Sequence, residues 1–128
     1  MKIEHAAYQV EHPADVAKWY VAHLGMTIKR SLPDRPWGHF LADSAGAVML
    51  EFYNNPKVAV PDYAAIDPLI LHVAFTTDDV EKARARLVAA GATAVGATDR
   101  NSLGDELAML RDPWGFAIQL VRRHTPML

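Results

Sequence analysis

Four polar side chains that can bind metals occupy matched places in the two halves of this 128-residue chain. His5 lies in Ile-Glu-His-Ala-Ala-Tyr, and His72 lies in the similar segment Ile-Leu-His-Val-Ala-Phe. Glu51 and Gln119 each follow in a later, strand-like segment of the same half. Imidazole nitrogens and carboxylate or amide oxygens are ligands of divalent zinc, nickel, cobalt, manganese and iron. The matched pairs therefore predict one metal site, whereas any one of these residues alone would indicate only a half-buried polar side chain.

The composition excludes several kinds of chemistry and argues against some classes of partner. The chain has no cysteine, which excludes disulfides, thiolate catalysis and thiolate metal ligands. Its net charge is −2, and its 13 basic residues form no stripe or patch, which argues against a nucleic-acid partner. The sequence shows neither a signal-peptide pattern nor an apolar run of membrane-spanning length. We expect a cytoplasmic protein whose partner is a small molecule.

The repeat extends beyond the histidines to the order of the elements. In each half an alternating strand pattern is followed by a helical stretch that reaches a glycine, and then by three more strand-like runs. We predict an α+β fold of two tandem βαβββ modules that form a curled mixed sheet. The modules would span residues 1–54 and 69–128, joined by a linker at 55–68 that contains three prolines, within a single domain, 1–128. The second module is expected to begin with a strand at 69–76.

Strand alternation predicts which side chains share a face with the candidate ligands. His5 shares a face with Ala7, and Glu51 shares a face with Met49 and Tyr53. A carboxylate on such an apolar face is costly unless it is paired, and a divalent cation is one possible partner. Met49 and Tyr53 are the predicted substrate-binding residues of the pocket wall.

Several motifs resemble the vicinal oxygen chelate (VOC) superfamily, which includes glyoxalase I, bleomycin-resistance proteins and extradiol dioxygenases. They are the opening Ile-x-His, His-Leu-Gly-Met at 23–26, Met-Leu-Glu-Phe at 49–52, Leu-His-Val-Ala-Phe at 71–75 and Asp-Pro-Trp-Gly-Phe at 112–116. The resemblance covers essentially the whole chain. It implies paired βαβββ modules whose sheets form a cup around a divalent metal.

The resemblance also implies roles for the four residues. Glyoxalase I-like members take their ligands from the first and fourth strands of each module, which correspond here to His5, Glu51, His72 and Gln119. A ligating glutamate moves the proton in that reaction, so Glu51 is the candidate catalytic base. Bacterial glyoxalase I-like sequences have a second glutamate where this chain has Gln119. A neutral amide cannot accept the proton, and the metal would keep a net positive charge.

Three functions are compatible with this set. The preferred one is a metal-dependent lyase or isomerase, glyoxalase I-like, acting on a small substrate with vicinal oxygens. The second is a drug- or metabolite-binding protein of the bleomycin-resistance type that needs no metal and no turnover. The third is a dioxygenase, which Gln119 disfavours because such enzymes place a carboxylate ligand there. A homodimer is expected from the resemblance alone.

Two further groups of residues are given structural roles. The aromatic residues are expected in the core, and four arginines are expected to be solvated. These aromatic residues are Trp37, Phe40, Phe52, Phe75 and Trp114, and the arginines are Arg30, Arg35, Arg100 and Arg111.

Overall fold

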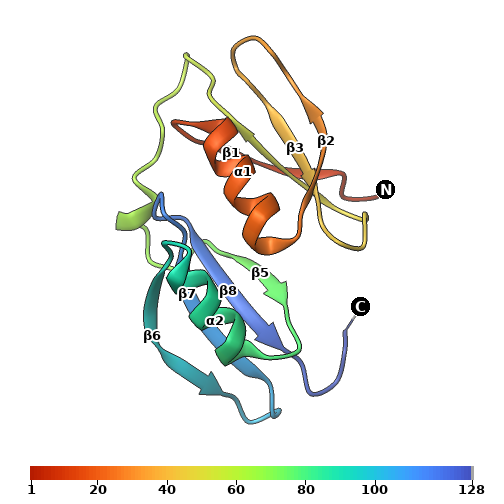
Figure 1. Ribbon diagram of the computed structural model, residues 1–128, viewed down its shortest axis with the longest axis vertical. Helices are drawn as coiled ribbons and strands as arrows, with labels where there is room; N and C mark the ends of the chain where they lie inside the picture. The colour runs from red at the N-terminus through yellow and green to blue at the C-terminus, as the bar shows by residue number, and fades with distance from the viewer. Residues whose placement is uncertain (128) are drawn as a thin grey trace. The chain divides into compact units, whose positions relative to one another are not determined.

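A computed structural model describes residues 1–127. The chain forms two compact units, the first ending at Pro61 and the second beginning at Asp62. Each described unit combines an α-helix with a four-stranded sheet (Figure 1). The first contains β1 (His5–Gln9), α1 (Pro13–Leu24), β2 (Thr27–Ser31), β3 (His39–Ala42) and β4 (Met49–Tyr53). The second contains the 3-10 helix η1 (Tyr63–Ala65), β5 (Val73–Thr76), α2 (Val80–Ala89), β6 (Thr93–Arg100), β7 (Glu106–Arg111) and β8 (Ala117–Arg122). This order confirms the prediction of two βαβββ modules in tandem.

Helix α1 has local signals at both ends. Pro13 occupies the start of the helix, where its fixed φ suits helical geometry and its missing amide hydrogen is not needed. Gly25 ends the helix with φ of 68°, a left-handed conformation that glycine adopts without steric cost. Tyr20 is fully buried, with its ring 4.7 Å from the ring of Phe52 on β4. The helix is thereby held on one face of the sheet.

The first sheet separates a buried face from an open one. Its strand order is β1-β4-β3-β2, with β1 parallel to β4 and the other pairs antiparallel. Leu41, Leu50 and Phe52 are buried on the face that α1 covers. Because side chains alternate along a strand, Ala7 and Glu51 lie on the opposite face. The core is thus packed on the helical side, which leaves the other side for polar chemistry.

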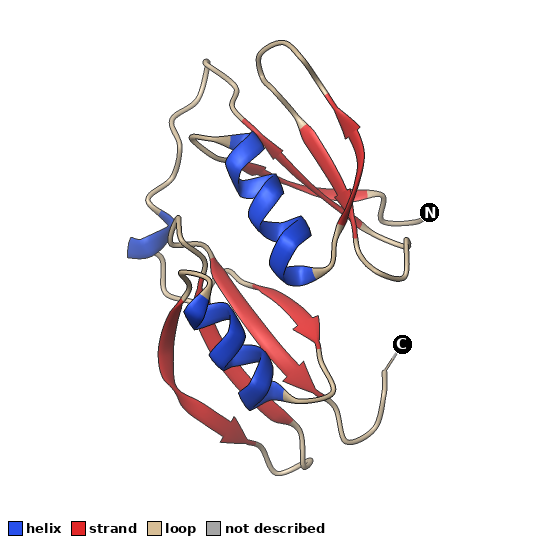
Figure 2. Cartoon of the chain, viewed as in Figure 1, coloured by secondary structure: helices blue, strands red, loops and turns tan. Residues whose placement is uncertain are grey.

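The second unit repeats this design with a different helix start. Asp79 caps α2, and its carboxylate accepts a hydrogen bond of 2.9 Å from the backbone N–H of Lys82. Val80 and Leu87 are fully buried, and the helix packs on the sheet (Figure 2). The strand order is β5-β8-β7-β6, the counterpart of the first sheet, with β5 parallel to β8.

The segment before β5 is packed onto the second unit through Arg111. Its guanidinium donates hydrogen bonds to the carbonyl oxygens of Tyr63, Gly115 and Ile66, at 2.9, 2.9 and 2.8 Å. The Tyr63 ring is buried 5.0 Å from the ring of Phe116. The expectation of a solvated Arg111 was wrong, because three backbone acceptors replace its water.

The start of one strand differs from the sequence prediction. Strand β5 begins at Val73 rather than at residue 69, because the backbone N–H of Ile70 bonds the carbonyl of Asp67 in a turn. Strand β6 continues to Arg100, with an irregular register between Val95 and Asp99. Within residues 1–127, no helix combines the length and apolar character that crossing a bilayer requires.

Candidate functional site

His5 and Glu51 come together on the open face of the first sheet. The parallel register pairs Ala7 with Glu51, so His5 stands two residues from the position opposite Glu51. Nε2 of His5 lies 3.5 Å from Oε2 of Glu51. The two side chains are 34% and 16% exposed, so both remain accessible to a ligand. The two candidate ligands of the first module therefore lie close to each other.

Two further residues fix the His5 ring. Its Nδ1 contacts the carboxylate of Glu4, the preceding residue. Its edge packs against Phe40 on β3, with ring centroids 5.5 Å apart and planes at 89°. Phe40 is the cross-strand neighbour of Glu51. Sequence reasoning missed Glu4 because ideal alternation places it on the opposite face from His5, yet the side chain of Glu4 reaches the ring from outside β1.

The second unit carries His72 and Gln119 in equivalent register. Ala74 pairs with Gln119, and His72 lies two residues before Ala74, just ahead of β5. Nδ1 of His72 lies 2.7 Å from the carbonyl oxygen of Pro68, which can only accept a hydrogen bond. The backbone relationship between histidine and second ligand is therefore the same in both modules.

No group of three or more His, Asp or Glu residues that could hold a metal occurs in the part of the chain that the structure describes. The first unit brings together His5 and Glu51, and the second carries His72 and Gln119. Each unit thus carries two of the candidate ligands, an imidazole and a carboxylate in the first and an imidazole and an amide in the second. Nitrogen and oxygen donors of these kinds suit divalent zinc, nickel, cobalt, manganese or iron.

The two predicted wall residues flank Glu51 on β4. Met49 pairs with His5, and Tyr53 pairs with Gln9, and both are half-buried. Gln9 is buried because its amide binds the backbone of the next segment, donating to the carbonyl of Asn55 at 2.8 Å and accepting from its N–H at 2.8 Å. Gln9 therefore closes one end of this face.

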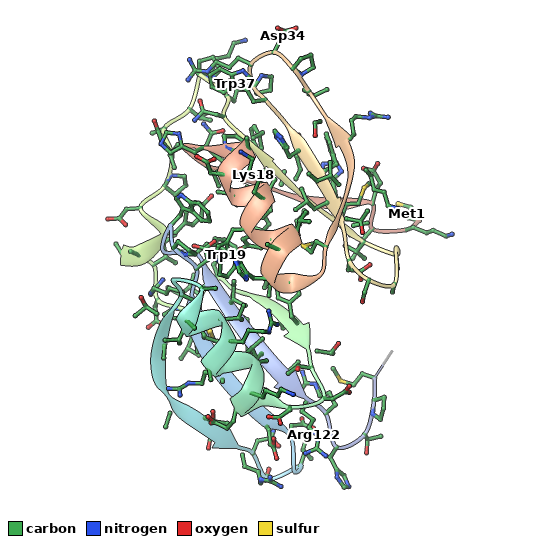
Figure 3. The ribbon with its side chains drawn as sticks, in the orientation of Figure 1. Met1, Lys18, Trp19, Asp34, Trp37 and Arg122 are labelled. Atoms are coloured by element: carbon green, nitrogen blue, oxygen red, sulfur yellow. The ribbon has the colours of Figure 1, made fainter. Side chains whose placement is uncertain are left out.

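The loop between β2 and β3 approaches the same carboxylate. Asn54, which is buried, accepts a hydrogen bond of 2.6 Å from the Arg35 guanidinium, and Arg35 lies 5.1 Å from the centre of the Trp37 ring. Trp37 has a left-handed φ of 51° and is 41% exposed, so the expectation that it belongs to the core was wrong (Figure 3). Arg35 is held by Asn54 and Trp37. Gly38 follows Trp37, and a β-carbon added to it would come 3.2 Å from Oε1 of Glu51.

A separate hollow of about 140 Å³ lies in the second unit, near the end of β8. It is lined by Arg100, Gly104, Glu106, Arg122, Arg123 and His124. Glu106 accepts from Arg100 and, at 3.5 Å, from Arg122, so Arg100 is ion-paired as well as exposed. Arg123 pairs with Asp105 at 2.8 Å. The hollow contains none of the four predicted ligands.

The pKa values of Tyr8 and Asp105 are displaced from their ordinary values. Burial raises the pKa of the Tyr8 phenol above its ordinary value. The pKa of Asp105 is lowered, first by the backbone N–H of His124 and then by Arg123 and Asn101. Neither group is a candidate ligand, so these shifts concern the scaffold rather than the site.

The sequence of residues 2–120 matches the profile of the Glyoxalase/Bleomycin resistance protein/Dioxygenase superfamily. The chain belongs to this superfamily. The match spans both modules and all four candidate ligands. The superfamily predicted from the motifs is therefore confirmed, while the match by itself assigns no particular reaction.

Solved structures of several other proteins share the fold. A family enzyme from Burkholderia phytofirmans PsJN aligns with a TM-score of 0.74 and 16% identity, over 94% of this chain and 98% of that one. A superfamily member from Sphaerobacter thermophilus DSM 20745 aligns with a TM-score of 0.69 and 15% identity, over 94% and 96%. TnmS3, an antibiotic binding protein from Streptomyces sp. CB03234, aligns with a TM-score of 0.72 and 21% identity, over 96% of each chain. The chain matches no curated protein in sequence.

Proposed function

We propose that this superfamily member is a metal-dependent lyase or isomerase, glyoxalase I-like, that acts on a small substrate with vicinal oxygen atoms. His5 and Glu51 would hold one divalent metal together with His72 and Gln119. Zinc, nickel, cobalt, manganese and iron(II) all suit this donor set. We also propose that the protein is a cytoplasmic homodimer. Light scattering of the purified protein tests the oligomeric state.

The observation that carries the proposal is the spacing of the His5 and Glu51 ligand atoms. Metal–nitrogen and metal–oxygen bonds of about 2.0–2.2 Å at a tetrahedral angle separate the two ligand atoms by about 3.4 Å. The observed separation between Nε2 and Oε2 is 3.5 Å. This distance is long for a hydrogen bond and suits two atoms that share a cation.

The charge of the set supports chemistry on a carbonyl substrate. One carboxylate leaves a divalent ion with a net positive charge, because Gln119 contributes a neutral amide. When bound, such an ion polarises the oxygen atoms of the substrate and makes a neighbouring carbon more acidic. A proton could then move to a carboxylate within reach.

Glu51 is the residue that would accept this proton. It is half-buried on the open face, and its cross-strand neighbour Ala7 is exposed and small, which leaves room above the carboxylate. Gln119 occupies the equivalent position beside Ala74 but has no basic oxygen of similar strength. Proton transfer would therefore depend on the first module, whereas the second module would help to bind the metal and orient the substrate.

Metal content is the first test. Protein purified without chelator or affinity metal should contain about one equivalent of metal by elemental analysis, and the variants His5→Ala and His72→Ala should lose it. His12→Ala is the matched control, since His12 is an exposed histidine at the start of α1. Wild-type protein that remains metal-free after reconstitution with each candidate ion would rule the proposal out.

Activity is the second test. Glyoxalase and epimerase substrates would be screened with the metal that the protein retains. Glu51→Gln should retain part of the metal affinity, because an amide oxygen can still ligate, but should lose turnover by about 10²–10⁴-fold. Equal activity of Glu51→Gln and wild type would exclude Glu51 as the base.

A second function, ligand binding without turnover, is favoured by the exposed Trp37 stacked on Arg35. An exposed, fixed indole suits an aromatic drug or metabolite. The structural similarity to TnmS3, itself an antibiotic binding protein, is consistent with this alternative. A binding protein of this kind should keep its ligand affinity in Glu51→Gln and His72→Ala but lose it in Trp37→Ala, as measured by tryptophan fluorescence and calorimetry.

A further inference from the structure

Both nitrogens of the His5 ring face carboxylate oxygens. Nδ1 contacts Glu4, and Nε2 lies 3.5 Å from Glu51. A neutral imidazole has one N–H donor and one nitrogen lone pair. Only one of the two carboxylates can therefore receive a hydrogen bond from neutral His5, and the other faces the lone pair.

The hydrogen bond to Glu4 indicates which nitrogen of neutral His5 carries the hydrogen. A carboxylate can only accept, so this bond places the hydrogen on Nδ1. Nε2 of neutral His5 then directs its lone pair toward Oε2 of Glu51. Two facing lone pairs repel each other, and a cation between them converts that repulsion into two favourable bonds.

His72 is held in the same tautomer by a different group. The acceptor for its Nδ1 is the carbonyl oxygen of Pro68, at 2.7 Å, which also leaves Nε2 as the lone-pair nitrogen. The two modules thus reach one tautomer by two independent contacts, a side-chain carboxylate in the first and a backbone carbonyl in the second. The same tautomer thus occurs in both modules although the acceptor differs, which indicates that the site requires a free Nε2 on each histidine.

We infer that Glu4 is a positioning residue that sets the tautomer of His5 and so prepares Nε2 for the metal, an inference that rests on the proposed function. Second-layer partners of ligating histidines fix the ring and raise its basicity, and their loss lowers metal affinity by about 10–100-fold. Glu4 is 69% exposed, so its effect belongs near the lower end of that range. Glu4 acts through His5 and touches neither substrate nor metal.

The test reads the His5 tautomer in metal-free protein by long-range proton–nitrogen NMR correlation, at a pH where imidazoles are neutral. Wild type should show hydrogen on Nδ1 of both His5 and His72. In Glu4→Ala the remaining acceptor is Glu51, so hydrogen should move to Nε2 of His5 while His72 stays unchanged. Glu4→Gln should keep the wild-type tautomer, because its amide oxygen still accepts. Glu11→Ala is the charge-matched control, since Glu11 is exposed just beyond β1.

Zinc titration calorimetry supplies the second readout. Affinity should fall about tenfold in Glu4→Ala and recover most of that loss in Glu4→Gln. An unchanged His5 tautomer in Glu4→Ala, or hydrogen on Nε2 in wild type, would overturn the role of Glu4. Because the tautomer is read without metal, failure of wild type to bind zinc would count against the proposed function, whereas the NMR result alone decides whether Glu4 sets the tautomer.

Discussion

Gly38 leaves little space for a side chain beside the carboxylate of Glu51. A β-carbon added to Gly38 would lie 3.2 Å from Oε1 of Glu51 and 3.3 Å from Cδ1 of Leu32. Gly38 is buried and has no left-handed φ, so glycine is needed here for space rather than for backbone conformation. The loop between β2 and β3 therefore limits where the candidate base can sit.

Gly38→Ala should weaken metal binding because the new methyl group displaces Glu51. If the added methyl group raises the free energy of the metal-bound state by about 1 kcal/mol, zinc affinity falls about fivefold. Zinc titration of wild type and Gly38→Ala measures this change in affinity. Gly46→Ala is the control. Gly46 has a φ of 68° and open space around it, so an alanine there strains the backbone without a steric clash. This variant should have a lower melting temperature and unchanged zinc affinity.

Gln119→Glu should tighten metal binding by about tenfold or more, since a second carboxylate neutralises the remaining charge of the ion. The metal-free variant should be less stable by about 1–3 kcal/mol, because the half-buried position then holds an unpaired carboxylate. Urea unfolding with and without zinc measures both effects. Equal zinc affinity in Gln119→Glu, Gln119→Leu and wild type would show that residue 119 is not a ligand.

Arg111→Met should destabilise the protein by about 2–4 kcal/mol, because three backbone carbonyls lose their charged donor. Arg84→Met is the matched control, since Arg84 donates to one carbonyl, that of Gly96 at 3.0 Å, and its loss should cost about 1 kcal/mol. Urea unfolding compares the variants. Equal destabilisation would contradict the role of Arg111 in holding the segment before β5.

The contribution of Asp105 to the free energy of unfolding should decrease at acid pH. Its pKa is lowered in the folded protein, so the ionised carboxylate stabilises the fold above the ordinary pKa of about 3.9, and this contribution is lost as pH falls through the folded pKa. The stability difference between wild type and Asp105→Asn should be constant from about pH 7 to 5 and shrink below about pH 4. Urea unfolding across this range measures it. Arg123→Gln should reduce the pH-dependent part without removing it, because His124 and Asn101 still donate.

Much of the fold could be predicted from local signals in the sequence. Three such signals are the helix end at Gly25, the carboxylate that caps α2 and the two-residue spacing that puts His5 and Ala7 on one face. Each is a property of neighbouring residues and is present in the structure. The start of β5 could not be predicted in this way. Residues 69–72 look like a strand but lie in a segment held by Arg111, which is distant in sequence.

The surroundings of the site were predicted less well than its members. Trp37 looked like a core aromatic, but the hydrogen bond between Arg35 and Asn54 fixes a turn that exposes it. Strand alternation places Glu4 and His5 on opposite faces and so does not reveal their side-chain contact. The exposure of Trp37 has another origin, because side-chain contacts between segments decide exposure and propensity does not encode them.

The sequence by itself determined the duplicated order of helices and strands and the matched positions of His5, Glu51, His72 and Gln119, since these follow from local pattern and repetition. Only the tertiary structure decided that Ala7 lies opposite Glu51 and that Nε2 of His5 comes to 3.5 Å from Oε2 of Glu51. The register between parallel strands is set by burial of one sheet face under a helix, as Tyr20 and Phe52 show in the first unit. Such packing joins segments that lie far apart in the sequence, and for that reason no local pattern contains it.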